Sequence, residues 1–310
     1  MARKRREEKK TGGAGNVISA VIMLAALAVF CFAGYKLVTI YLDYKTGVDE
    51  YAQLQELAGV SEAEDDKTIQ KETYGMQQDM EENDTLGDEW GEAVLTEGNK
   101  TKVFEEMENP IDFESLEKIN EDIVGWIEME AVETINYPVV QAVDNEYYLH
   151  RTFQKTDNFA GSIFLDCVNK SNFCERNTII YGHNMKNGSM FGSLKQYREK
   201  ETFEKSPYFW IYTPNRIYKY EIFSCAEVDK FGPDYQISFR DREDFETFID
   251  RAKEQSLYDT GVEVKYSDTI VTLSTCTGNE ETRFIVQGKR VRTYVASSKE
   301  VADDTGIVME

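Results

Sequence analysis

Metal-binding side chains are scarce in this sequence. The chain of 310 residues has two histidines, His150 and His183, and none of its five cysteines forms a CxxC pair. Structural zinc sites take four Cys or His ligands, and their cysteines commonly come in closely spaced pairs. The sequence therefore does not support a metal site, and we expect a protein that works without a metal or another cofactor.

The sequence also has too few cysteines to indicate a small secreted domain that is stabilised by several disulfides. Cys31 lies in an apolar run near the N-terminus, and Cys276 ends a strand-like run. The other three, Cys167, Cys174 and Cys225, do not form the dense framework that small secreted domains use. A Cys167–Cys174 disulfide is one interpretation, and isolated buried thiols are the one that we favour.

Basic residues are few between residues 43 and 109. This stretch holds 20 acidic and five basic residues, a net charge of −15 within a total of −22. Nucleic acid and anionic lipid attract basic surfaces, so we expect neither as a partner. Apolar and aromatic residues recur at helical spacing up to Leu57 and only weakly after it. We therefore interpret residues 43–109 as a juxtamembrane helix followed by an acidic linker.

One long apolar run stands near the N-terminus. The first ten residues carry six basic and two acidic side chains, and the uncharged run Val17–Tyr35 of 19 residues follows. That is about the length that crosses a ~30 Å hydrocarbon core at ~1.5 Å per residue. A cleaved signal peptide is the alternative, but its apolar region is shorter and ends in a small-residue cleavage site that we do not find. Basic segments that flank a membrane helix stay on the cytoplasmic side of the membrane. We therefore predict a cytoplasmic tail (1–16), a transmembrane anchor (17–42) and an extracellular remainder.

Helical patterns appear at three places after the linker. Asp112 can cap a short helix with one apolar stripe, made of Phe113, Leu116, Ile119 and Ile123. Residues 189–206 look like a short helix with connecting coil. Residues 241–256 form a better helix, whose apolar side holds Phe245, Phe248, Ile249 and Ala252.

Strand patterns dominate the rest of residues 110–297. Short runs rich in β-branched and aromatic residues alternate with Gly, Asn, Asp and Pro, the pattern of a mainly antiparallel β-barrel or sandwich. The runs are TINYPVV, GSIFLD, NTIIYGH, FWIYTP, IYKYEIFSCAEV, DTIVTLSTC and RFIVQGKRV. We therefore expect one mainly β domain over 110–297, followed by a flexible tail over 298–310.

The last two predicted strands place a cysteine opposite an arginine. Side chains alternate between two faces along TIVTLSTC, so Ser274 and Cys276 share one face. If the six residues 277–282 form the turn, Cys276 and Arg283 stand directly opposite each other, and thiol and guanidinium project together from the end of a sheet. An arginine there favours thiolate over thiol and stabilises negative charge on a carbonyl oxygen under attack.

A histidine ends another strand-like run. His183 is flanked by Gly182 and Asn184, in a loop that can present its ring. It is the candidate proton carrier, which protonates a leaving amine and later deprotonates an incoming one. His150 is the rival histidine, but its segment YYLHRTF favours a surface role. Cysteine, histidine and arginine at strand ends supply the parts of acyl transfer through a thioester.

These motifs carry a family resemblance. YGHNMKNGSMFGSLKQY, GSIFLD, TLSTC and RFIVQGKR together resemble the sortase family of cell-wall transpeptidases, class B in particular. The resemblance implies a closed β-barrel with an N-terminal helix and a helix-bearing insertion before the nucleophile strand. It implies cleavage of a surface protein's C-terminal sorting signal after Thr, and transfer to an amine of a lipid II-like peptidoglycan precursor. By motif match, the catalytic residues are His183, Cys276 and Arg283.

The same resemblance implies a substrate groove. The segment matching DNEYYL contributes Asn145 and Leu149, and Tyr181 and Ser274 line up with groove positions within their own motifs. Class B is favoured by the N-terminal helix and by the insertion at 229–267. A pilin-polymerising class C enzyme would be expected to carry a C-terminal membrane segment and an inhibitory lid, and neither is evident.

Two other functions stay open at this point. A cysteine peptidase would release the same thioester to water, although His183 precedes Cys276, the reverse of the order in papain-like enzymes. A non-enzymatic module that scaffolds surface proteins would not require His183, Cys276 and Arg283 to converge.

Overall fold

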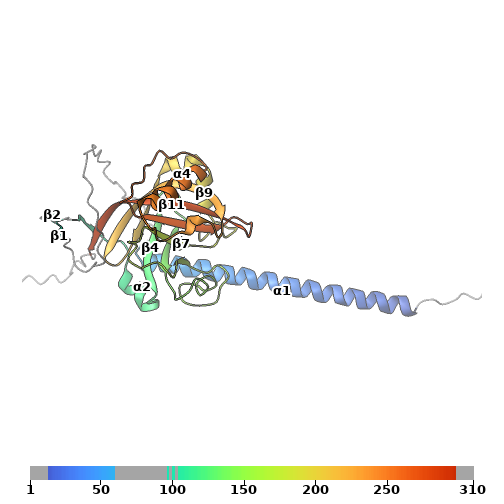
Figure 1. The fold of residues 1–310 in the computed structure, drawn as a ribbon. Coiled ribbons are helices and arrows are strands. Elements are labelled where there is room, and N and C mark those ends of the chain that lie inside the picture. Colours follow the sequence, from blue (N-terminus) through green and yellow to red (C-terminus); the bar gives the residue numbers. More distant parts are fainter. Residues whose placement is uncertain (1–12, 60–95, 98–99, 102–103, 298–310) are drawn as a thin grey trace, which may run out of the picture. The chain divides into compact units, whose positions relative to one another are not determined.

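The computed structural model describes residues 13–59, 96–97, 100–101 and 104–297 (Figure 1). The chain divides into two units, Met1–Asp49 and Glu50–Glu310, which are described separately. Most of the acidic linker, most of the predicted basic tail and the whole of the tail over 298–310 lie outside the described residues.

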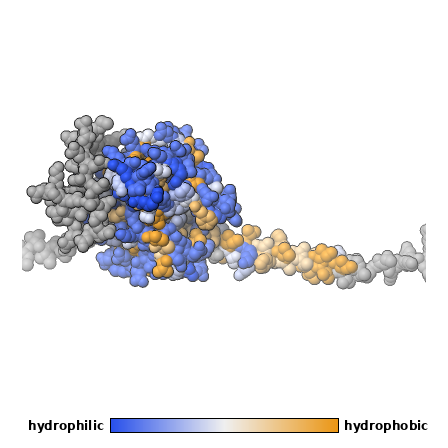
Figure 2. Space-filling view, viewed as in Figure 1, coloured by the Kyte–Doolittle hydropathy of each residue, from blue (hydrophilic) through white to orange (hydrophobic). Residues whose placement is uncertain are grey.

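One helix, α1 (Gly13–Leu57), makes up the described part of the first unit and ends in the second. Its apolar side chains are exposed from Ile18 to Leu42, and they form the hydrophobic stretch of Figure 2. Within the described residues it is the one helix that is long and apolar enough to cross a membrane. The predicted anchor lies inside α1, which ends at Leu57 as the juxtamembrane helix was expected to.

The second unit is built on a closed β-barrel. Its sheet has the strand order β10-β7-β6-β5-β4-β8-β9-β11-β3, and pairing of β10 with β11 closes a ring of the first eight strands. The strands are β3 (Glu106–Glu108), β4 (Ile123–Met129), β5 (Asn136–Val140), β6 (Ile163–Leu165), β7 (Asn177–Tyr181), β8 (Tyr208–Tyr212), β9 (Arg216–Asp229), β10 (Ile270–Cys276) and β11 (Thr282–Ser297). A separate pair, β1 (Thr96–Glu97) and β2 (Lys100–Thr101), precedes them.

The seven predicted strands are all present, but the described residues contain further strands that were not predicted. Each of the seven predicted runs overlaps one strand, β5 to β11. Most pairings are antiparallel, but β7–β10, β5–β6 and β3–β11 are parallel. The sequence analysis missed β4, because it assigned Ile123 to the stripe of the preceding helix. That helix stops at Ile119, which is 42% exposed, and the chain is already extended at Asn120.

Helices cover the barrel where the sequence analysis expected them. In α2 (Phe113–Ile119) the Asp112 side chain accepts from the Ser115 N–H at 3.0 Å. The stretch 189–206 contains the short helices η1 (Leu194–Arg198) and α3 (Lys200–Lys205). In the insertion after β9, η2 (Pro233–Tyr235) precedes α4 (Arg242–Gln255). The apolar side of α4 packs on β9 and β10, in a buried cluster of Phe223, Phe245, Phe248, Ile249, Ala252 and Ile270.

The folded unit begins earlier than residue 110, the boundary that the sequence analysis expected. β3 pairs with the end of β11, and Tyr51, Leu54 and Ala58 are buried. The Tyr51 hydroxyl donates to the Gly161 carbonyl at 2.9 Å. These segments are acidic or short, so their own composition does not show that the barrel covers them.

Candidate active site

The edge of the barrel at which β7 and β10 end carries the two predicted reactive groups. Because the two strands are parallel, their carboxyl ends meet at the same edge. Tyr181 pairs with Ser274 in the last step of the ladder, 93 residues apart. The same offset separates His183 from Cys276. The register of the pair therefore brings the histidine loop alongside the end of the cysteine strand, and the sequence analysis did not foresee this pairing.

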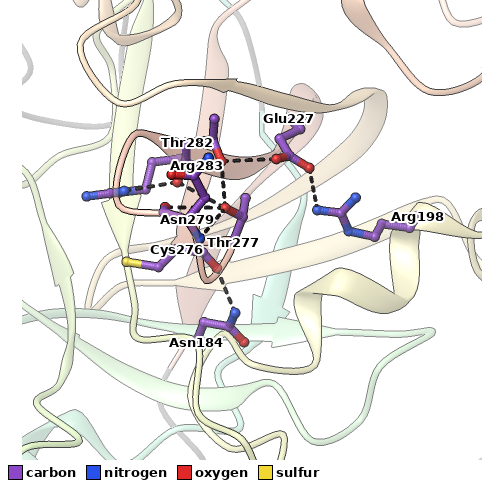
Figure 3. Close-up of polar contacts among 8 residues, drawn as sticks. All are labelled: Asn184, Arg198, Glu227, Cys276, Thr277, Asn279, Thr282 and Arg283. Carbon is purple, nitrogen blue, oxygen red and sulfur yellow. Dashed lines mark hydrogen bonds and ion pairs between the residues drawn. The ribbon is translucent and has the colours of Figure 1, made fainter.

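One backbone bond and two side-chain bonds join the two segments beyond the Tyr181–Ser274 pair. The Gly182 N–H donates to the Ser274 carbonyl at 3.1 Å, and the Thr275 hydroxyl donates to the Gly182 carbonyl at 2.7 Å. The Asn184 amide then donates to the carbonyl of Cys276 at 2.7 Å (Figure 3). The loop that carries His183 is thus bound to the strand end that carries Cys276, on both sides of the histidine. Asn184 and Thr275 lie within the sequence motifs, but nothing in the motifs predicts these bonds.

Gly182 is required at its position because the backbone passes close to buried side chains. A Cβ atom there would lie 2.4 Å from Cδ1 of Ile163 and 2.7 Å from the ring of Phe191. Both neighbours are fully buried. A larger residue would push the loop, and His183 with it, away from β10.

The predicted opposition of Cys276 and Arg283 is confirmed. The two residues are partners in the antiparallel β10–β11 register, at the last step before the turn. In Figure 3 the sulfur and the guanidinium project to the same side of the turn. Nη1 of Arg283 donates to the carbonyls of Glu280 at 3.2 Å and Thr282 at 3.0 Å. The guanidinium is therefore held over the turn by its own backbone.

All seven predicted site residues line one cavity of about 440 Å³. The cavity wall contains His183, Cys276 and Arg283, together with the four residues assigned to the groove, Asn145, Leu149, Tyr181 and Ser274. Lys230, Phe231 and Tyr235 from the start of the insertion complete it. A thiol, an imidazole and a guanidinium thus face the same space, as acyl transfer requires.

Burial favours the neutral form of the His183 ring. Its Nε2 lies 2.7 Å from the carbonyl oxygen of Leu149, which can only accept, so Nε2 carries the proton and Nδ1 the free lone pair. Burial lowers the pKa of His183 below its usual value, the Leu149 bond opposes this shift, and the charge of His150 adds to it. His150 is exposed, as predicted, but its ring centroid lies 6.2 Å from that of His183.

A buried aspartate organises the groove side of the cavity. Oδ2 of Asp166 accepts from the Tyr181 hydroxyl and from the Asn145 amide, each at 2.9 Å. Burial and the nearby Asp166 carboxylate raise the pKa of Tyr181 well above its usual range, so the phenol stays a donor. The sequence analysis missed Asp166, although it ends the quoted run GSIFLD.

Tyr235 closes the other side of the groove. Its hydroxyl lies 2.8 Å from that of Ser274, and its ring stacks with Tyr181 at a centroid distance of 6.3 Å. Burial raises the pKa of Tyr235 to about 12, and the bond to Ser274 and the positive charge of Arg283 oppose that rise. No local motif marks this residue, because it comes from the insertion and reaches the cavity through the fold.

The remaining cysteines stay apart. Each of the five is a free thiol, so the Cys167–Cys174 disulfide is not formed. Cys225 is buried, and burial raises its pKa to about 12, whereas Cys167 and Cys174 are half-buried rather than buried. Across the described ranges, no three His, Cys, Asp or Glu side chains gather where they could hold a metal ion.

These features define a class: closed β-barrel proteins with a thiol, an imidazole and a guanidinium at one edge. A family model described as a sortase domain matches residues 127–291. Sortase B of Listeria monocytogenes is 40% identical over 156 residues, which are 49% of this chain and 63% of that protein. Sortase B of Staphylococcus aureus is 36% identical over 164 residues, 53% of this chain and 67% of that protein. The chain belongs to the sortase family.

Solved structures agree with this assignment. Sortase B from B. anthracis in complex with AAEK1 matches with a TM-score of 0.61 and 32% identity, over 82% of this chain and 100% of that chain. A Staphylococcus aureus sortase B–substrate complex matches with a TM-score of 0.55 and 34% identity, over 58% of this chain and 84% of that chain. The predicted closed barrel and the resemblance to class B are therefore confirmed. The sequence match spans less than two thirds of the Listeria relative.

Proposed function

We propose that the chain is a membrane-anchored cysteine transpeptidase of the sortase B type. The observation that carries this proposal is the shared cavity of His183, Cys276 and Arg283, in a chain of the sortase family. Its substrate is a surface protein with a C-terminal sorting signal, which the enzyme cleaves after Thr. Its acceptor is the amine of a lipid II-like peptidoglycan precursor.

The chemistry follows from the three side chains. As the sulfur of Cys276 attacks the Thr carbonyl carbon, Nδ1 of neutral His183 takes the thiol proton. The C–N bond then breaks, and the imidazolium returns that proton to the leaving amine. The guanidinium of Arg283 stabilises the negative charge on the carbonyl oxygen. The acceptor amine next attacks the thioester and its proton passes to His183. The C–S bond then breaks, and the leaving sulfur of Cys276 takes that proton, which restores the thiol and the neutral imidazole.

The groove residues are proposed to bind the sorting signal ahead of the Thr. Asn145, Tyr181 and Ser274 offer polar groups to the cavity, and Leu149 offers an apolar side chain. Asp166 orients the first two, since both donate to its Oδ2. The carbonyl of Leu149 orients His183, so the same segment serves substrate and proton carrier.

The apolar part of α1 is proposed as the membrane anchor. Its length and composition fit one span, and the basic N-terminal residues favour a cytoplasmic N-terminus with the barrel outside. The acidic residues of the linker would keep the barrel solvated near the cell surface.

The test uses the full chain in detergent with a library of sorting-signal peptides and an amine acceptor. Mass spectrometry should detect a thioester on the wild type and an amide product with the acceptor. Cys276→Ala should abolish both cleavage and the thioester, whereas Cys225→Ala should retain both because that thiol is buried elsewhere. Cleavage that persists in Cys276→Ala would overturn the proposal.

Hydrolysis is the second candidate, because water can reach an open cavity as an amine can. Product analysis with and without the acceptor separates the two. A free acid as the sole product at saturating amine would make the chain a peptidase. A non-enzymatic scaffold would not require His183, Cys276 and Arg283 to line one cavity, so the shared cavity argues against that alternative.

A further inference from the structure

The 277–282 turn between β10 and β11 is bound from outside by a charged side chain. Glu227 stands on β9 beside the start of β11, and its Oε1 accepts from the Thr282 hydroxyl at 3.0 Å. Its Oε2 accepts from Nη2 of Arg198, at the end of η1, at 2.8 Å. In Figure 3 both charged side chains lie on the side of the turn away from the Cys276 sulfur.

Inside the turn, two threonine hydroxyl groups extend this hydrogen-bond network. The hydroxyl oxygens of Thr277 and Thr282 lie 2.6 Å apart, and the Asn279 N–H donates to the Thr277 oxygen at 3.2 Å. These two threonines directly adjoin the pair whose opposition forms the site, since Thr277 follows Cys276 and Thr282 precedes Arg283.

The carboxylate of Glu227 sets the direction of the two threonine hydroxyl bonds. The bonds from Arg198 and Thr282 hold the pKa of Glu227 below its usual value, so it is an acceptor only. The single proton of Thr282 must therefore point to Glu227, and its oxygen accepts from Thr277. The oxygen of Thr277 in turn accepts from Asn279. One ionised group thus sets the orientation of both hydroxyls that close the turn.

The guanidinium of Arg283 depends on the same turn. Two of its bonds go to the carbonyls of Glu280 and Thr282, so any change in the turn backbone moves the cation. Gly278, at φ +99°, gives the turn a conformation that other residues rarely adopt. Lys230 also binds the turn at Glu281, through a side-chain ion pair of 3.0 Å and a backbone hydrogen bond of 3.0 Å.

We propose that Glu227, held by Arg198, is a positioning residue that acts through Thr282 and Thr277 to keep Arg283 and Cys276 in the geometry for attack. The role rests on the proposed transpeptidase function. Variants that break this hydrogen-bond network are therefore expected to slow the acyl-transfer step more than they weaken peptide binding or the stability of the fold.

The experiment compares Thr282→Val, which removes the hydroxyl, with Thr282→Ser, which keeps it. The full chain is assayed with the best-cleaved peptide of a sorting-signal library, and the rate of thioester formation and KM are measured separately. Thr282→Val and Glu227→Ala should lower the rate by about 10- to 100-fold with KM nearly unchanged, because small misplacements of catalytic groups cost rates of that order. Thr282→Ser should keep most of the rate.

The matched control is Glu114→Ala on α2, which breaks the exposed Lys118–Glu114 pair of 2.8 Å, a bond of the same length as Arg198–Glu227. It should leave rate and KM unchanged. A wild-type rate in Thr282→Val, or an equal loss in Thr282→Ser, would overturn the proposal.

Hydrogen exchange of the peptide covering 277–283 gives a readout that needs no activity. Exchange there should rise in Thr282→Val and Glu227→Ala but not in Thr282→Ser or Glu114→Ala. A rise spread equally over the barrel, or none in the turn, would contradict the positioning role. A wild type that forms no thioester would reject the proposed function, while the exchange data would still decide whether the network orders the turn.

Discussion

The two edges of β10 hold the proposed catalytic side chains by different means. On the β7 edge, neutral groups bind the histidine loop: Thr275, which is 3% exposed, and Asn184 both donate to backbone carbonyls. On the β11 edge, Thr282 at the turn before Arg283 donates to Glu227, which pairs with Arg198, and the side chains of this ion pair are each 38% exposed. Buried neutral bonds are costly to break and insensitive to salt, whereas exposed ion pairs contribute little and are screened. The β7 edge should therefore govern stability, and the β11 edge should govern the fine placement of the cation.

The largest effect is expected from Gly182→Ala. The new methyl group would meet Ile163 and Phe191 in a packed region, and such overpacking costs about 1–3 kcal/mol. Urea unfolding should show this loss, and the thioester rate should fall as His183 moves. Gly34→Ala is the control, because no atom lies within 4 Å of the Cβ that it adds. Equal unfolding midpoints for Gly182→Ala and wild type would show that the β7 edge is not tightly packed.

A loss of stability of similar size is expected from Thr275→Val, which keeps the shape of the side chain but removes its hydroxyl. The Gly182 carbonyl then loses a buried donor, at a cost of about 1–3 kcal/mol. The same change at the half-exposed Thr282 should cost under about 1 kcal/mol, because water can replace the lost bond. Chemical unfolding of the two variants side by side measures the difference. Equal losses would remove the distinction between the edges.

Salt should act on the β11 edge alone. The free energy of unfolding of Glu227→Gln should lie below that of the wild type by no more than about 1 kcal/mol at low ionic strength. That difference should shrink towards zero near 1 M salt, since the Arg198–Glu227 pair is exposed and screened. The loss in Thr275→Val should not change with salt. Unfolding curves at two salt concentrations check both statements.

The smallest effect concerns the two histidines. Removing His150 takes away one of the causes that lower the pKa of His183, so His150→Ala should raise that pKa while burial keeps it below the usual value. An NMR titration can follow this directly, because the variant has a single imidazole. Lys118→Ala, on the surface of α2, should leave the pKa of His183 unchanged. An unshifted His183 in His150→Ala would mean that the solvent screens the pair completely.

The lowered pKa of His183 also sets the sign of a stability change with pH. Between the folded-state pKa and the unfolded value of about 6.5, the unfolded chain binds more protons at this site. The contribution of His183 to the free energy of unfolding is thus highest above about pH 6.5 and falls as the pH drops through that window. His183→Gln should flatten this part of the profile relative to the wild type.

Much of the fold could be predicted because its signals are local. Alternation along TIVTLSTC and the six-residue gap were enough to place Cys276 opposite Arg283, since a hairpin joins neighbouring segments. The cap at Asp112 and the apolar side of α4 depend equally on nearby residues. The family motifs then predicted roles for His183 and for the four residues assigned to the groove, and one cavity brings these residues together.

The contacts that the sequence did not reveal join distant segments. Nothing near Asp166 or Tyr235 shows that each reaches a groove residue, and Glu227 is one of many acidic residues on a strand. β3 and the end of α1 were missed as parts of the folded unit for the same reason. Their roles come from partners that lie far away in the chain.

The sequence by itself determined which chemical groups this protein can use, where seven of the barrel strands lie, and that Cys276 faces Arg283 across a short turn. Only the tertiary structure decided that β7 lies parallel to β10, so that His183 reaches the same edge, and that Glu227 and Arg198 hold the turn. The physical reason is that periodicity and turn length act over a few residues. The choice of a strand's neighbour depends on the packing of the whole barrel, which no local pattern records.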